Sequence, residues 1–193
     1  FDLDRIFFSG DIMWDILKKT IKEQKIESNS GDYNVMTIHR KENADNPIRM
    51  KNIIDVLLET STKIVFPIHP RTRKNLEKFD LLSKLESSNN IDLISPLGYV
   101  DYIKLMAGSS KVITDSGGVR REAYLLGKPC IVPVEMVWFP EIVDAGWMKV
   151  VGNDPDSFAD AIMNFNPNSK RPEIFGDGKA HVYIVERIKE VFG

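Results

Sequence analysis

The sequence is nearly free of cysteine. Cys130 is the only one among 193 residues, so no disulfide can form within the chain. It lies in the apolar stretch 129–132, which is typical of a buried strand and leaves a catalytic thiol as the lesser alternative. No apolar run is long enough to cross a bilayer, and no positively charged segment followed by an apolar one stands at the start. We therefore expect a cytoplasmic protein.

An excess of charge of either sign is also absent. The formal net charge is -2, which provides no extended basic surface for nucleic acid or for an anionic membrane. No group of His, Cys, Asp or Glu residues has the spacing of metal ligands, so we expect neither a metal nor another cofactor. An anionic ligand would therefore have to be held by a local site.

Segments rich in apolar and β-branched residues alternate with helical patterns from residue 33 onwards. This alternation predicts an α/β fold, a Rossmann-like parallel sheet flanked by helices. We divide the chain into residues 1–32, a junction strand, helix and loop at a domain boundary, and residues 33–193, a sheet domain with a C-terminal helix. The strands are predicted at residues 34–38, 63–68, 91–95, 111–114, 130–133 and 148–151.

Helical spacing of apolar residues fills the connections between these strands. The best marked helix follows Asn46, a favoured N-cap, and Pro47, which suits a first helical position. An apolar stripe from Ile184 to Phe192 predicts a C-terminal helix that needs a surface to cover. Since residue 1 is Phe rather than Met, we expect sequence upstream of this chain. The remaining predictions are helices at residues 71–79, 99–107, 118–126, 156–165 and 11–22, and a short strand at 5–8.

Polar residues follow three of the predicted strands. His39 and Arg40 come after the first strand, His69 after the second and Ser116 after the fourth. Ligands of an open parallel sheet bind beyond the carboxyl ends of its strands. The charge of Arg40 suits an anionic ligand. A histidine can contact such a ligand by its charge or take part in proton transfer. The alternative is that Arg40 pairs with Glu42 on the surface and that the histidines have structural roles.

Two glycines stand at the turn between the fourth predicted strand and its helix. Gly117 and Gly118 let a ligand approach the backbone, and free N–H groups at the helix start favour phosphate, with the Ser116 hydroxyl as a further donor. Glu122, about one turn further, is placed to accept hydrogen bonds from ribose hydroxyls. Tyr102 suits stacking on a base or packing in the core. An ordinary turn capped by Ser116 fits the same residues.

Taken together, these stretches resemble the non-hydrolysing UDP-N-acetylglucosamine 2-epimerases, which have the two-domain glycosyltransferase-B fold. The resemblance covers nearly all of the chain, and the order and spacing of its pieces make it more specific than any one motif. The pieces are Gly10-Asp11 with Asp15, residues 37–43, 67–70, 96–99 and 114–122, Gly127-Lys128-Pro129, Pro140-Glu141 and Gly176-Asp177-Gly178.

The resemblance implies that this chain is one half of that fold, the half that binds UDP. Ser116, Gly117 and Gly118 would hold the diphosphate. Glu122 would bind the ribose, and Tyr102 with its preceding turn would bind the uracil.

The resemblance also implies a reaction. In the family, UDP is eliminated from UDP-N-acetylglucosamine to give a 2-acetamidoglucal and is added back with inversion at C2, which yields UDP-N-acetylmannosamine. His39 would face the reacting sugar and is the catalytic candidate, with Arg40 beside it as a UDP ligand. His69 would lie near the nucleotide-sugar pocket, and in bacterial relatives a second UDP-sugar acts as a regulator.

Much of the proton chemistry in the family belongs to carboxylates of the N-terminal domain, which would precede Phe1. We therefore expect the chain to bind UDP and UDP-N-acetylhexosamine but not to turn over alone. A homodimer is implied only by analogy with relatives.

Val134 and Phe139 stand where the family usually carries arginines. Two alternatives stay open: a UDP-sugar-dependent glycosyltransferase of the same fold, and a non-catalytic nucleotide-sugar sensor, which the missing arginines favour.

Overall fold

The computed structural model describes residues 6–193 and divides them into two compact units. One unit comprises Glu27–Arg171 and holds the whole sheet. The other comprises residues 6–26 together with Pro172–Gly193.

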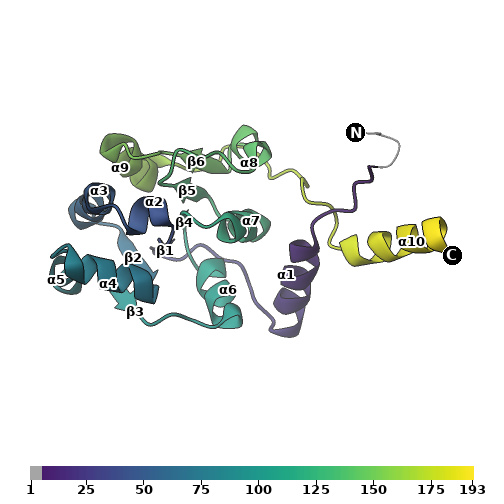
Figure 1. The fold of residues 1–193 in the computed structure, drawn as a ribbon, viewed down its shortest axis with the longest axis horizontal. Coiled ribbons are helices and arrows are strands. Elements are labelled where there is room, and N and C mark those ends of the chain that lie inside the picture. Colours follow the sequence, from purple (N-terminus) through teal and green to yellow (C-terminus); the bar gives the residue numbers. More distant parts are fainter. Residues whose placement is uncertain (1–5) are drawn as a thin grey trace. The chain divides into compact units, whose positions relative to one another are not determined.

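The larger unit is built on six parallel strands in the order β3-β2-β1-β4-β5-β6 (Figure 1). All six predicted strands are present, each within two residues of its predicted ends, and the α/β Rossmann-like fold is confirmed. Their bounds are β1 Tyr33–Thr37, β2 Lys63–Pro67, β3 Ile91–Ile94, β4 Val112–Thr114, β5 Cys130–Val132 and β6 Met148–Val150.

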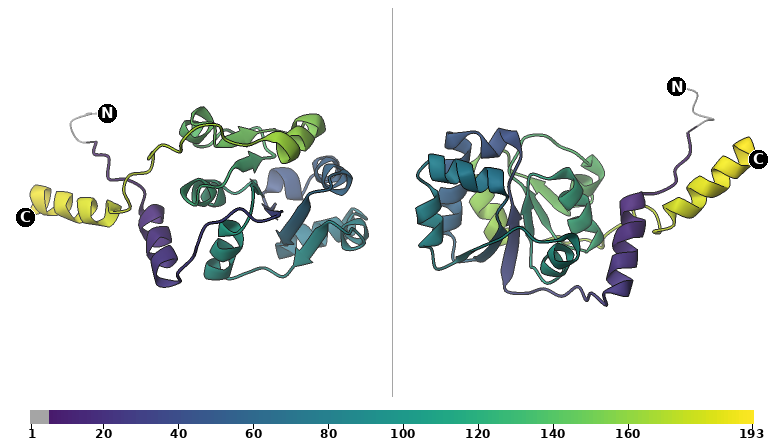
Figure 2. Two further views of the ribbon diagram at one scale, coloured as in Figure 1. Left: turned by 180° about the vertical axis from the view of Figure 1, so that it is seen from behind. Right: turned by 60° about the horizontal axis from the view of Figure 1, so that its bottom comes forward.

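Helices cover both faces of the sheet, as the right-hand view of Figure 2 shows. Met36, Ile113 and Ile131 join one apolar core with residues of the helices on their side. Their neighbours Val35 and Cys130 are fully buried too, and side chains that alternate along a strand point to opposite faces. The central strands β1, β4 and β5 therefore lack the in/out polar alternation of a sheet with one wet face.

The helices of the larger unit fill the crossovers between its strands. Asn46 caps α3 as predicted, because its side chain accepts hydrogen bonds from the N–H groups of Ile48 and Arg49, and Pro47 is the first helical residue. Three short helices, α2, α5 and α8, were not predicted, since four or five residues show no helical period. The bounds are α2 Lys41–Ala44, α3 Pro47–Glu59, α4 Pro70–Lys78, α5 Leu82–Glu86, α6 Tyr99–Ala107, α7 Gly117–Leu125, α8 Pro140–Asp144 and α9 Pro155–Asn164.

The smaller unit pairs two helices from opposite ends of the chain, α1 (Ile12–Glu23) and α10 (Ala180–Phe192). Asp15 of α1 accepts hydrogen bonds from the N–H groups of Ala180 and His181, at 3.0 and 2.8 Å, and so caps α10. The nearby chain segments meet where the N–H of Asp11 donates to the carbonyl of Phe175 at 3.0 Å. Several matching pieces of the resemblance thus build this unit.

The strand expected near the start of the chain needs correction. Residue 5 lies outside the described residues, and residues 6–8 form no strand, since none of their backbone groups joins a sheet ladder. The smaller unit includes the C-terminal helix, since α10 packs on α1. The larger unit begins at Glu27, and within it the N–H groups of Asn29 and Gly31 donate to the carbonyls of Ala107 and Gly108.

Candidate active site

The two central strands mark the point where the chain reverses its direction of winding across the sheet. From β1 the chain proceeds outward through β2 and β3, and from β4 it proceeds to the other edge. In such sheets the carboxyl ends of the two central strands border a natural crevice. His39 and Arg40 follow β1, and Asp115 and Ser116 follow β4, so the structure brings these predicted residues to one rim.

Asp115 holds this rim together. Its carboxylate is fully buried and accepts hydrogen bonds from the backbone N–H of His39 at 3.1 Å and of Arg40 at 2.9 Å. The side-chain amide of Asn43 donates to the same group at 3.2 Å. The sequence placed Asp115 in the glycine turn but did not predict a role for it. A signal was available, because an aspartate directly after a buried strand requires polar partners.

His39 is held next to Asp115 but keeps an exposed edge. Its Nδ1 lies 3.5 Å from Oδ1 of Asp115, and 38% of its side chain is exposed. With Nδ1 facing the carboxylate, Nε2 is the ring nitrogen left for a ligand. His69 lies nearby, with 5.8 Å between the two ring centroids, and its Nδ1 accepts the N–H of Arg71 as the N-cap of α4.

The start of α7 is open to a ligand on one side. A Cβ built at Gly118 would meet nothing within 4 Å. The Ser116 hydroxyl makes no capping hydrogen bond to the part of the chain that the structure describes. The alternative, in which the Ser116 side chain caps α7, is therefore wrong. Free N–H groups, a helix dipole and a hydroxyl are the usual elements of a phosphate site.

The other side of the α7 start is covered by Trp138. A Cβ built at Gly117 would lie 2.6 Å from the indole ring. The guanidinium carbon of Arg40 lies 4.1 Å and that of Arg120 5.8 Å from the centre of the same ring. Together with Glu42 and neighbouring residues they line a cavity of about 340 Å³, whose remaining walls are Val134, Glu135 and Met136.

Glu122 lies buried on α7 beside two tyrosines of α6. Burial raises the pKa of its carboxyl, and a hydrogen bond from Tyr99 and the charge of Arg121 partly oppose that rise. Burial, together with the negative charge of Glu122, raises the pKa of Tyr99 to about 12. The same two causes raise the pKa of Tyr102. The Tyr102 hydroxyl has no hydrogen-bond partner among residues 6–193. Sequence reasoning named Tyr102 and missed Tyr99, although Tyr99 stood in a matching piece.

The two positions without the usual arginines lie close to this rim. Val134 is almost fully buried and lines the cavity beside Trp138. Phe139 has a left-handed backbone, with φ 63°, and precedes α8. The guanidinium carbon of Arg121 lies 5.2 Å from the centre of the Phe139 ring.

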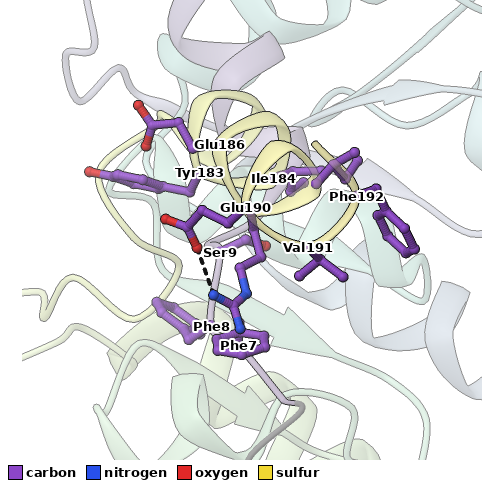
Figure 3. A pocket seen from close by; sticks show the side chains of 11 residues that line it. Phe7, Phe8, Ser9, Tyr183, Ile184, Glu186, Glu190, Val191 and Phe192 are labelled. Carbon is purple, nitrogen blue, oxygen red and sulfur yellow. Dashed lines mark hydrogen bonds and ion pairs between the residues drawn. The ribbon is translucent and has the colours of Figure 1, made fainter.

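A larger cavity, of about 550 Å³, lies in the smaller unit (Figure 3). It runs between residues 7–9 and one face of α10, and Phe7, Phe8, Val191 and Phe192 make it largely apolar. Arg187, whose guanidinium carbon lies 3.6 Å from the centre of the Phe7 ring, donates to Glu190 at 2.6 Å. This charge is paired, so the cavity lacks the cluster of free donors that a diphosphate requires.

No group of three or more His, Cys, Asp and Glu side chains among the described residues could hold a metal ion. No helix within residues 6–193 has both the length and the apolar character needed to cross a membrane.

Known proteins similar to this chain share both its sequence and its fold. A Methanococcus maripaludis UDP-N-acetylglucosamine 2-epimerase homolog is 39% identical over 96% of this chain and 55% of its own length. A Methanocaldococcus jannaschii UDP-N-acetylglucosamine 2-epimerase is 35% identical over 94% of this chain and 54% of its own length. The crystal structure of that organism's UDP-GlcNAc 2-epimerase in complex with UDP-GlcNAc and UDP superposes with a TM-score of 0.88, at 33% identity, over 98% of this chain and 56% of that one.

The chain thus spans about half the length of the curated relatives it matches. The family model described as UDP-N-acetylglucosamine 2-epimerase matches residues 1–189, nearly the whole chain. On this match and the close relatives, the chain belongs to the UDP-N-acetylglucosamine 2-epimerase family.

Proposed function

We propose that this chain is the nucleotide-binding half of a UDP-N-acetylglucosamine 2-epimerase and that it holds UDP at the carboxyl ends of β1 and β4. The observation that carries the proposal is the start of α7, where Gly118 is open, the Ser116 hydroxyl is unused as a cap, and the Arg40 guanidinium lies close by. Helix N–H groups and a guanidinium are complementary to a diphosphate.

The nucleoside of UDP would extend from this turn along α7 and α6. Glu122 accepts the ribose hydroxyls, and the Tyr102 ring region binds the uracil. A buried carboxyl and a phenol without a hydrogen-bond partner among the described residues support this placement, because buried polar groups favour a ligand that satisfies them.

His39 is the catalytic candidate on this half. Asp115 orients Nδ1, so Nε2 is presented to the sugar at the same rim that holds the diphosphate. In the reaction, the C1–O bond to UDP breaks as the proton leaves C2, and UDP returns to C1 of the glucal as a proton is added to C2 from the opposite face. The carboxylates for this proton transfer come from the remaining half of the longer protein. His69 would contact the nucleotide sugar or a second UDP-sugar.

Binding is tested on the chain itself by amide NMR titration with UDP. The largest shift changes are expected at Ser116, Gly117, Gly118 and the residues after β1. Ser116→Ala, which removes one donor, should weaken UDP binding about three- to tenfold, since a hydrogen bond to a charged group contributes roughly 1–2 kcal/mol. Shift changes confined to the smaller unit, or none at saturating UDP, would contradict the proposal.

Turnover is tested by following C2 of UDP-N-acetylglucosamine by NMR. The 193-residue chain should bind the nucleotide sugar and leave C2 unchanged. A full-length protein containing the chain should form UDP-N-acetylmannosamine. Epimerisation by the chain alone would refute the need for a second half. UDP release that depends on an acceptor would favour a glycosyltransferase. Full-length protein that binds the nucleotide sugar without turnover would favour a sensor.

A further inference from the structure

Trp138 makes three contacts that converge on the start of α7. Its ring packs against Gly117, stacks under the Arg40 guanidinium at 4.1 Å, and lies 5.8 Å from that of Arg120. The side chain belongs to the irregular segment between β5 and α8, and 36% of it is exposed. The buried part of the indole contacts the backbone of Gly117 and the guanidinium groups of Arg40 and Arg120, so these contacts fix how the ring lies.

The Arg40 guanidinium is left without a carboxylate partner among the described residues. Its side chain contacts the Trp138 ring, and within residues 6–193 it forms no surface ion pair with Glu42, the pair that the sequence allowed. One of its terminal nitrogens lies 3.9 Å from the Cβ position at Gly117. The charge is therefore unneutralised and is placed against the first turn of α7.

Arg120 adds a second positive charge behind the same ring. Its side chain is 2% exposed, and it donates to the carbonyls of Met136 at 3.2 Å and Asp115 at 3.3 Å. Burial and, to a smaller extent, the Arg40 charge lower the pKa of Arg120. Two guanidinium groups thus share one aromatic ring at the edge of the candidate diphosphate site.

We propose that Trp138 is a positioning residue for the diphosphate of the nucleotide sugar, because it fixes the Arg40 guanidinium beside the α7 N–H groups. This inference rests on the proposed function. Trp138 thus holds at the α7 turn an arginine that comes from a distant part of the chain. Arg121 over Phe139 is a second instance of the same contact.

The test compares Trp138→Leu with Trp138→Phe in NMR titrations of the chain with UDP and with uridine. Losing the ring should weaken UDP binding about three- to tenfold, the range expected for a partly buried cation–π contact, and Phe should retain most of the affinity. Uridine affinity should not change, because uridine carries no phosphate. A purely structural role of Trp138 would instead lower UDP and uridine affinity together.

A double-mutant cycle identifies the residue through which the ring acts. In an Arg40→Met background, Trp138→Leu should have no further effect on UDP affinity. Trp14→Leu is the matched control, since Trp14 also lies near a cation, with the Lys18 ammonium 5.9 Å from its ring centre, but belongs to the smaller unit. This control should leave UDP affinity unchanged.

Three further results would overturn the inference. UDP affinity equal to wild type in Trp138→Leu would show that the ring does not position a ligand group. Tighter UDP binding by that variant would show that the ring obstructs the turn. Wild-type chain that binds no UDP would overturn the proposed function together with this inference, whereas the first two results would leave the proposed function standing.

Discussion

The carboxylate of Asp115 accepts the backbone N–H of His39 at 3.1 Å, although the two residues are 76 positions apart in the sequence. This contact joins the ends of β4 and β1 and aligns the histidine ring with the turn that begins α7. One buried carboxylate therefore sets the geometry of the candidate catalytic residue and of the candidate phosphate site.

Replacing Asp115 by alanine should cost both stability and ligand binding. The N–H groups of His39 and Arg40 and the amide of Asn43 would lose their shared acceptor, which predicts a loss of about 3 kcal/mol in the free energy of unfolding. Urea denaturation measures this loss. Asp92→Ala is the control: Asp92 also links neighbouring strands, through Lys63 at 3.2 Å, but the pair is exposed and should contribute less than about 1 kcal/mol. Equal losses for the two variants would contradict the assigned role of Asp115.

The two glycines of the α7 turn should respond differently to alanine. Gly118→Ala has open space for its Cβ and should leave stability unchanged or raise it by up to about 1 kcal/mol, while UDP affinity falls about tenfold. Gly117→Ala would clash with the Trp138 ring and should cost about 1–3 kcal/mol. Thermal unfolding and UDP titration measure both effects. In a Trp138→Ala background the stability cost of Gly117→Ala should disappear, and a cost that persists would place the clash elsewhere.

Asp15 should make the stability of the smaller unit depend on pH in acid. Burial tends to raise its pKa, but hydrogen bonds from His181 and Ala180 outweigh burial and lower the pKa below the ordinary value of 3.8. The stabilisation from Asp15 is therefore complete above pH 3.8 and is lost as the pH falls below it. Asp15→Ala should cost about 1 kcal/mol at pH 7, the usual effect of a lost helix cap. Helical circular dichroism during acid titration should show a smaller pH dependence in the variant than in wild type.

Glu122 should behave in the opposite way. Burial raises its pKa above the ordinary 4.5, so folding favours the protonated carboxyl. Below pH 4.5 the carboxyl costs nothing, and as the pH rises through the raised folded-state value the ionised group destabilises the fold. Glu122→Gln should therefore be more stable than wild type at pH 7 and equal to it at pH 4 in urea denaturation. The same variant should bind UDP about tenfold more weakly if Glu122 accepts the ribose hydroxyls, and unchanged affinity would exclude that role.

The sequence alone was sufficient for the six strands and the longer helices of the sheet unit. Buried strands followed by helical stripes leave few arrangements other than a parallel sheet, because both kinds of apolar surface must be covered. Asn46 and Pro47 marked the start of α3 because capping depends on neighbours in the chain. The predicted strand at residues 5–8 is wrong over the described residues 6–8, which have an apolar pattern but join no sheet, and a strand is stable only within a sheet.

The sequence by itself determined the sheet unit and the rim where His39, Arg40 and Ser116 meet, because strand ends follow from local pattern and parallel strands share one polarity. Only the tertiary structure decided that Asp115 holds that rim, that Trp138 lies on Arg40, and that Asp15 of α1 caps α10. These contacts join segments far apart in the chain. Which residues meet in these contacts depends on where the fold places each segment. Neither the periodicity of the sequence nor the neighbouring residues encode that placement.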